Sequence, residues 1–153
     1  MTAAPTYELA QLNIATLRAP LDSPQLADFV ANLDRINALA EAAPGYLWRL
    51  QSLDGNATGL RPLGEQVIIN LSVWADVDAL RAYAYRADHA AIMRRRRDWF
   101  ERSAEAYLVL WWVPRGRRPT VEEALARLDT LRRDGPTAAA FTFARLFPPP
   151  VVS

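Results

Sequence analysis

The order of hydrophobic patterns along the chain restricts its fold more than any other feature. Residues 7–18 alternate between apolar and polar side chains, which indicates a strand. Residues 25–42 carry apolar side chains every three or four positions, which indicates an amphipathic helix. Further strands are expected over 46–53, 66–75 and 106–114, and a second long helix from Asp76 or Asp78 to about Arg102. This β-α-β-β-α-β order predicts an α+β, ferredoxin-like fold with an antiparallel sheet.

The chain continues past this pattern. Thr120 begins a Thr-Val-Glu-Glu capping box, which predicts a third helix ending at Gly135-Pro136, and an apolar, proline-ended arm follows. We expect a single domain over 1–153, with its core in 7–114 and the C-terminal helix and arm in 120–153. Four strands and two helices would leave one apolar sheet face bare. Such a face favours a homodimer in which two sheets pack against each other.

Composition excludes several classes of function. The formal net charge is +1, so bulk charge does not favour nucleic acid as a partner. Cysteine and lysine are absent, which removes thiolate nucleophiles, cysteine-bound metals and lysine Schiff bases. A single histidine cannot build a histidine-rich zinc site, so no metal is expected. No apolar run approaches a membrane span and residues 1–11 lack a signal-peptide pattern, so we expect no membrane segment and a cytoplasmic location.

The only histidine, His89, marks a candidate pocket. On a helix over 76–102, it shares one mostly apolar stripe with Tyr85, Met93, Arg96 and Phe100. Large apolar groups with a few convergent polar ones are what a small-molecule pocket needs. An unperturbed imidazole titrates near neutrality, so His89 suits a general acid or base. Two other interpretations stay open, an axial metal ligand and a buried structural histidine.

Four consecutive arginines, Arg94 to Arg97, surround the whole circumference of that predicted helix. Most of them should reach water or pair with carboxylates such as Asp98. Arg96 differs because its helical phase places it with His89. A buried guanidinium needs an anion, which would be either a carboxylate of the chain or a carboxylate or enolate of a substrate.

A polar stripe runs along the strand predicted over 66–75. Asn70, Ser72 and Trp74 alternate on one face, whereas the residues between them are apolar. Polar side chains are unusual on a strand that must be half buried, so Asn70 and Trp74 are candidates for a pocket. The alternative is a sheet-edge Asn70 and a core Trp74.

Five segments give the chain a family resemblance: YELAQLNIATLRAPLDSP, FVANLDRINALAEAAPGYLWRLQ, NLSVW, HAAIMRRRRDWF and YLVLWWVPRGRRPTVEEAL. They cover most of residues 7–135. Through them the chain resembles the dimeric α/β-barrel superfamily, which includes antibiotic-biosynthesis monooxygenases and haem-degrading monooxygenases. It is most similar to a branch known only as a domain of unknown function. Where that branch has a glycine and a histidine, this chain has Gly116 and Arg117, so no role for a second histidine is expected.

The resemblance implies a homodimer with a pocket in each subunit. In cofactor-free monooxygenases of the superfamily an Asn and a Trp line the pocket, and Asn70 and Trp74 match them; the amide would stabilise a phenolate or enolate oxygen. In haem-degrading members an Asn, a Trp and an axial His surround haem. Asn13, Trp74 and His89 match those three, and Arg96 would pair with a propionate. The spacing from Trp74 to His89 is longer than that motif requires.

We therefore expect a small-molecule tailoring enzyme, an oxidoreductase of antibiotic biosynthesis or other secondary metabolism, that acts on an aromatic or polyketide-like metabolite. The reaction would be oxygenation without a cofactor, or an acid–base cyclisation or isomerisation. His89 would move the proton, and Asn70 and Arg96 would stabilise oxyanion charge. The residues expected to line the substrate are Trp74, Tyr85, Asn13, Met93 and Phe100. A haem-binding protein or haem monooxygenase, and a non-catalytic ligand-binding or stress-response module, remain as alternatives.

Overall fold

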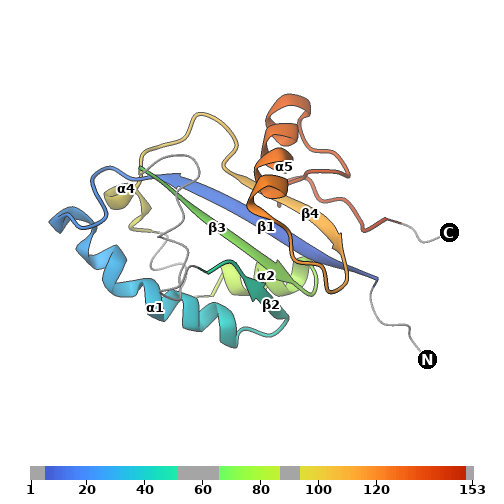
Figure 1. Cartoon of the computed structure of the whole chain (residues 1–153), viewed down its shortest axis with the longest axis horizontal. Coiled ribbons are helices and arrows are strands. Elements are labelled where there is room, and N and C mark those ends of the chain that lie inside the picture. Colours follow the sequence, from blue (N-terminus) through green and yellow to red (C-terminus); the bar gives the residue numbers. More distant parts are fainter. Residues whose placement is uncertain (1–5, 52–65, 87–93, 151–153) are drawn as a thin grey trace.

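A computed structural model of the chain describes residues 6–51, 66–86 and 94–150. Its sheet contains β1 (Tyr7–Thr16), β2 (Tyr46–Arg49), β3 (Val67–Trp74) and β4 (Leu108–Pro114), in the order β2-β3-β1-β4, and every pair is antiparallel. The helical segments are η1 (Pro24–Leu26), α1 (Ala27–Ala42), α2 (Val77–Ala84), α4 (Arg96–Trp99) and α5 (Val121–Asp134). The expected α+β, ferredoxin-like fold is confirmed (Figure 1).

On one face of the sheet α5 packs against β1 and β4, and we call this face the α5 face. The even-numbered side chains of β1 point to it, and Ala10 and Leu12 lie there opposite Trp111 and Val109 of β4. All four are fully buried. Helix α5 packs its apolar stripe against them, with Leu128 only 2% exposed. Figure 1 shows α5 in front of the sheet, on the side away from α2.

This cover corrects the expectation of a bare sheet face. The third helix folds back onto the sheet because its own apolar stripe needs a partner. In the part of the chain that the structure describes, the exposed large apolar side chains are Val30, Tyr85 and Leu146, and none belongs to the sheet. The face is therefore not bare over β1 and β4, and the homodimer stays a prediction.

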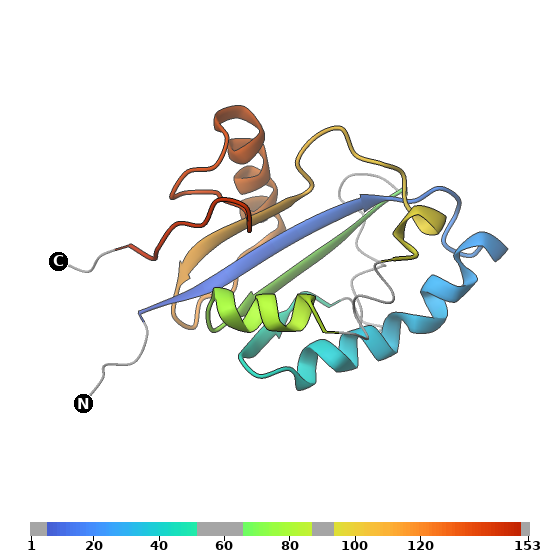
Figure 2. The same cartoon turned by 180° about the vertical axis from the view of Figure 1, so that it is seen from behind.

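The C-terminal arm closes the edge of β4. Leu110 and Phe141 exchange two backbone hydrogen bonds of 2.8 Å, so the arm adds a short antiparallel bridge to the last strand. Trp112 Nε1 also donates to the Phe147 carbonyl at 2.9 Å. Figure 2 shows the arm running beside β4. The free edge that β4 would otherwise present is thus occupied by the chain itself.

The opposite face of the sheet lies under α1, α2 and α4, and we call it the helix face. At one end Leu9, Leu110 and Trp74 pack against α2. At the other end Ala15 and Ile68 pack against a cluster from α1 and α4. Between these two apolar ends the face carries polar side chains, which form the candidate site.

The second helix is much shorter than predicted. Helix α2 ends at Ala84, and α4 spans only Arg96–Trp99. The backbone then becomes extended at Phe100 because the end of β1 competes for its hydrogen bonds: Arg18 N donates to Trp99 O at 2.9 Å, and Glu101 N donates to Thr16 O at 2.8 Å. A single helix from 76 to 102 is therefore wrong. None of the described helices is long and apolar enough to cross a membrane.

Candidate functional site

Four polar side chains form a hydrogen-bonded group at the centre of the helix face, and we call it the amide network. Asn13 stands opposite Asn70, and Gln11 opposite Ser72, across β1 and β3. Gln11 Nε2 donates to Asn70 Oδ1 at 2.8 Å and to Ser72 Oγ at 2.9 Å. Asn13 Nδ2 donates to Gln11 Oε1 at 3.1 Å. Strand alternation places all four on one face, and the antiparallel register brings them together.

The network is anchored on one side and open on the other. Gln11 and Ser72 are buried, at 4% and 6% exposed, whereas Asn13 is half-buried and Asn70 is exposed. Among the described residues, neither Asn70 Nδ2 nor Asn13 Oδ1 has a hydrogen-bond partner. The network therefore offers one amide donor and one amide acceptor side by side. A ligand hydroxyl could use both, because it donates to Asn13 Oδ1 and accepts from Asn70 Nδ2.

Trp74 anchors the network to the apolar end of the face. Its Nε1 donates to Ser72 Oγ at 2.9 Å, and only 1% of the residue is exposed. Tyr83 of α2 stacks on the indole with ring centroids 5.1 Å apart, and Tyr46 meets it edge-on at 5.7 Å. The Trp74 indole thus orients the Ser72 hydroxyl, and Tyr83 covers one face of that indole. The core alternative for Trp74 describes these contacts better than direct packing on a substrate ring.

The Tyr83 side chain that stacks on Trp74 is uncharged at neutral pH. Its hydroxyl donates to the Ile36 carbonyl at 3.3 Å, which ties α2 to α1. Burial raises the pKa of Tyr83 from 10.0 to about 12. Tyr83 therefore stays protonated at neutral pH and cannot serve there as a base.

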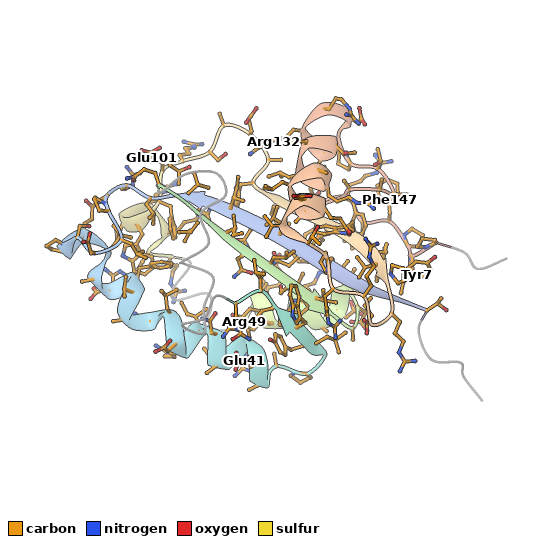
Figure 3. The ribbon with its side chains drawn as sticks, in the orientation of Figure 1. Tyr7, Glu41, Arg49, Glu101, Arg132 and Phe147 are labelled. Atoms are coloured by element: carbon orange, nitrogen blue, oxygen red, sulfur yellow. The ribbon has the colours of Figure 1, made fainter. Side chains whose placement is uncertain are left out.

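Arg49 is a neighbouring cation that sequence reasoning did not identify. It lies across β2 and β3 from Ser72, and its side chain is 12% exposed. Its guanidinium pairs with Glu41 at 2.8 Å, and Figure 3 shows the two side chains together at the β2 edge. Arg49, Asn37 and Asn70 line a small hollow of about 30 Å³. A fixed cation therefore adjoins the open side of the network.

The hydrogen bond between Gln11 and Ser72 was not predicted from the sequence either. Gln11 alternates with Asn13 along the first strand just as Ser72 alternates with Asn70 on the third. That shared polar alternation is the signal that could have found them. Only the pairing register shows that the two stripes meet, and register is not visible in one sequence.

Arg96 lies apart from the network, against aromatic rings. Its guanidinium carbon is 4.4 Å from the Tyr107 ring centroid and 5.8 Å from that of Phe100. It is half-buried and has no carboxylate partner within the described residues. Arg95, by contrast, pairs with Asp28 at 2.9 Å and Asp98 at 3.2 Å. Arg96 is thus the member of this pair without a fixed anion.

The predicted helical stripe does not come together as expected. Tyr85 caps the end of α2 and is 73% exposed, so its assignment to the interior is wrong. Phe100 is buried, in the aromatic cluster with Trp99. The predictions for His89 and Met93 lie outside the described residues. Of the predicted lining residues, Asn13, Asn70 and Trp74 are the ones that the sheet joins, through Gln11 and Ser72.

The haem alternative fits these residues poorly. It requires the Trp74 indole to face the macrocycle, yet that ring stacks on Tyr83 and gives its N–H to Ser72. We therefore derive no step through haem.

The chain is similar to one family model and to several solved structures. A family model described as "Domain of unknown function (DUF3291)" matches residues 8–153. None of the curated proteins compared with the chain matches it. The structure of PA3566 from Pseudomonas aeruginosa is 14% identical, with a TM-score of 0.50, and covers 76% of this chain and 100% of its own.

Two further solved structures have lower TM-scores. SnoaB, a cofactor-independent oxygenase from Streptomyces nogalater, is 20% identical over 74% of this chain and 96% of its own, with a TM-score of 0.46. A dabb family protein with a ferredoxin-like fold from Mesorhizobium loti is 18% identical over 71% of this chain and 99% of its own, with a TM-score of 0.44.

Proposed function

The chain belongs to the DUF3291 family, and we propose that it is a small-molecule tailoring enzyme that acts on an aromatic or polyketide-like metabolite. The observation that carries this proposal is the amide network in the middle of an otherwise apolar sheet face. Apolar surroundings with a few placed polar groups are typical of small-molecule sites. The oxygen-binding groups are the Asn70 Nδ2 donor and the Asn13 Oδ1 acceptor.

These two groups suit a phenol or an enol. Asn13 Oδ1 would accept a hydrogen bond from the hydroxyl, and Asn70 Nδ2 would donate to the same oxygen as it loses its proton. Gln11 holds both asparagines, which fixes the donor before the reaction begins. A donor that is already oriented where oxyanion charge develops stabilises the transition state without reorganisation.

Stabilising the enolate favours oxygenation without a cofactor, the class implied by the resemblance to antibiotic-biosynthesis monooxygenases. The enolate carbon is electron-rich and can transfer electrons to dioxygen. For a ring CH2, the balance is one CH2 and one O2 giving one C=O and one water, with all four electrons supplied by the substrate. His89 stays the proposed base, and Arg96 stays a proposed partner for negative charge, because it has no fixed carboxylate among the described residues.

A non-catalytic ligand-binding module is the second candidate. The observation in its favour is that no side chain of the amide network titrates: two asparagines, a glutamine and a serine bond one another. Such a group can bind and orient an oxygen but cannot remove a proton. Catalytic turnover of a test substrate distinguishes the enzyme from the non-catalytic binding module.

Dithranol, a dihydroxyanthrone, tests the proposal because it is planar, phenolic and enolisable. Wild-type protein in air-saturated buffer should speed its conversion to danthron, the corresponding anthraquinone, above the spontaneous rate. Asn70→Ala should lower that rate by about 100-fold, the loss typical of one oxyanion donor. Asn32→Ala is the matched control, since Asn32 lies on α1 outside the amide network and bonds Asp28 O.

A rate equal to the spontaneous rate would contradict the enzyme proposal. Binding of danthron without turnover of dithranol would favour the binding module. An Asn70→Ala variant as active as wild type would remove the amide network from the reaction.

A further inference from the structure

Asn37 of α1 is directed toward the amide network. It shares one helical stripe with Leu33, one turn before it, and Ala40, one turn after it. Leu33 packs against the cluster that contains Trp99, and Ala40 packs against the cluster that contains Trp74. Because these contacts hold the stripe against the two apolar ends of the helix face, Asn37 lies over the polar middle between them.

The hollow beside Asn70 is polar and large enough for one water molecule. Its lining residues are Asn37, Arg49, Leu50, Asn70 and Leu71, and its volume is about 30 Å³. Among the described residues, the half-buried side chain of Asn37 makes no hydrogen bond, and Asn70 Nδ2 makes none either. Two polar groups that line one small space without bonding each other are suited to a bridging water.

We propose that one water molecule binds in this hollow, donates a hydrogen bond to Asn37 Oδ1 and accepts one from Asn70 Nδ2. Two to four polar partners hold a bound water, and the Arg49 guanidinium gives the hollow a third polar side. Asn37 is then a positioning residue, because it acts on Asn70 through the water. Since Nδ2 carries two hydrogens, the bond to the water leaves one hydrogen for the ligand oxygen.

The water fixes the Asn70 amide from its second side. Gln11 Nε2 already donates to Asn70 Oδ1 at 2.8 Å, and the water holds the Nδ2 end of the same amide. Asn70 is exposed, so holding both ends restricts a side chain that would otherwise lose freedom when a ligand binds. The water itself is independent of the proposed function, whereas the effect of Asn37 on ligand binding rests on it.

A crystal structure of the wild-type protein without ligand tests the water directly. We expect an ordered water about 3 Å from both Asn37 Oδ1 and Asn70 Nδ2. The water should be lost in Asn37→Leu and kept in Asn37→Asp, which retains an Oδ1 acceptor at nearly the same volume. A wild-type hollow without ordered water, or a direct hydrogen bond between the two asparagine side chains, would overturn the proposal.

The affinity for danthron measures the effect of this positioning. It should fall about fivefold in Asn37→Leu, since one hydrogen bond contributes about that factor, and it should be retained in Asn37→Asp. Asn32→Leu is the matched control, because Asn32 lies on the same helix outside the amide network and bonds Asp28 O, and it should bind as wild type does.

Equal affinity in Asn37→Leu and Asn32→Leu would refute the positioning role of Asn37. An equal loss in Asn37→Leu and Asn37→Asp would refute it as well, because only the first change removes the acceptor for the water. If wild-type protein does not bind danthron, the proposed function fails, and the crystal structure still decides whether the water is present.

Discussion

Gln11 and Ser72 stand directly opposite each other across β1 and β3, and Gln11 Nε2 lies 2.9 Å from Ser72 Oγ. They are the two buried polar residues among those that the structure describes. Buried polar groups are stable only when hydrogen-bonded, and here each satisfies the other. Their bond holds the Gln11 side chain between Asn13 and Asn70. The open donor and acceptor of the site are therefore oriented by a buried pair beneath them.

Replacing Gln11 by Leu should destabilise the protein although the volume is nearly kept. The change leaves Asn13 Nδ2 and Asn70 Oδ1 without their partner. The free energy of unfolding, measured with urea, should fall by about 1–3 kcal/mol. Gln25→Leu is the control, since Gln25 is exposed and bonds only Asp98 O, and it should stay within about 0.5 kcal/mol of wild type. Equal effects of the two changes would contradict a bonded network.

The fold was largely predictable because its signals are local. Strand alternation gave the two faces of β1 and β3, and capping residues gave helix starts: Thr120 Oγ1 accepts from Glu123 N at 3.1 Å, and Asp76 Oδ1 from Ala79 N at 2.8 Å. Ser23 precedes η1 but makes no capping hydrogen bond, so a serine before a helix does not always cap it. Capping patterns report local backbone needs, which tertiary contacts can override.

Where contacts between residues distant in sequence determine the structure, the prediction was incomplete or wrong. The helical stripe of Tyr85 and Arg96 assumed one continuous helix, but α2 ends at Ala84 with Tyr85 as its C-cap, and Arg96 begins the separate helix α4. The bare sheet face assumed that α5 points away. The amide network was half predicted, through Asn13 and Asn70, because the register that joins them to Gln11 and Ser72 cannot be inferred from one sequence.

The packing of α5 against the sheet should depend on Leu128. This side chain is 2% exposed and packs with Trp111 and its neighbours, so Leu128→Ala leaves a cavity in the core. We expect a loss of about 2–5 kcal/mol in the free energy of unfolding. Leu125→Ala, on the same helix but only half-buried, should cost clearly less. If both cost the same small amount, α5 does not cover the sheet in solution.

Stability should fall at high pH, and Tyr83 should cause part of the fall. Its pKa is raised from 10.0 to about 12 by burial, so the unfolded chain loses this proton first. The contribution is complete below pH 10 and is lost as pH rises from 10 through about 12. Urea unfolding of Tyr83→Phe should show a shallower fall in that range. Tyr85→Phe, at an exposed position, should retain the wild-type slope; identical slopes for both variants would contradict the assignment.

Hemin should not bind specifically. The Trp74 indole is stacked on Tyr83 and bonded to Ser72, so it offers no open face to a porphyrin. A visible titration should give the spectrum of free hemin, in wild type and in His89→Ala alike. A Soret shift that is present in wild type and lost in His89→Ala would restore the haem alternative.

The central claim is that a ligand oxygen binds at the open side of the amide network. Side-chain amide signals of ¹⁵N-labelled protein test it directly during a danthron titration. We predict that the Asn70 and Gln11 amide signals shift together with one saturation curve, while the signal of Asn32, which lies outside the amide network, stays in place. Saturable binding of danthron that leaves the Asn70 and Gln11 signals unmoved would contradict it.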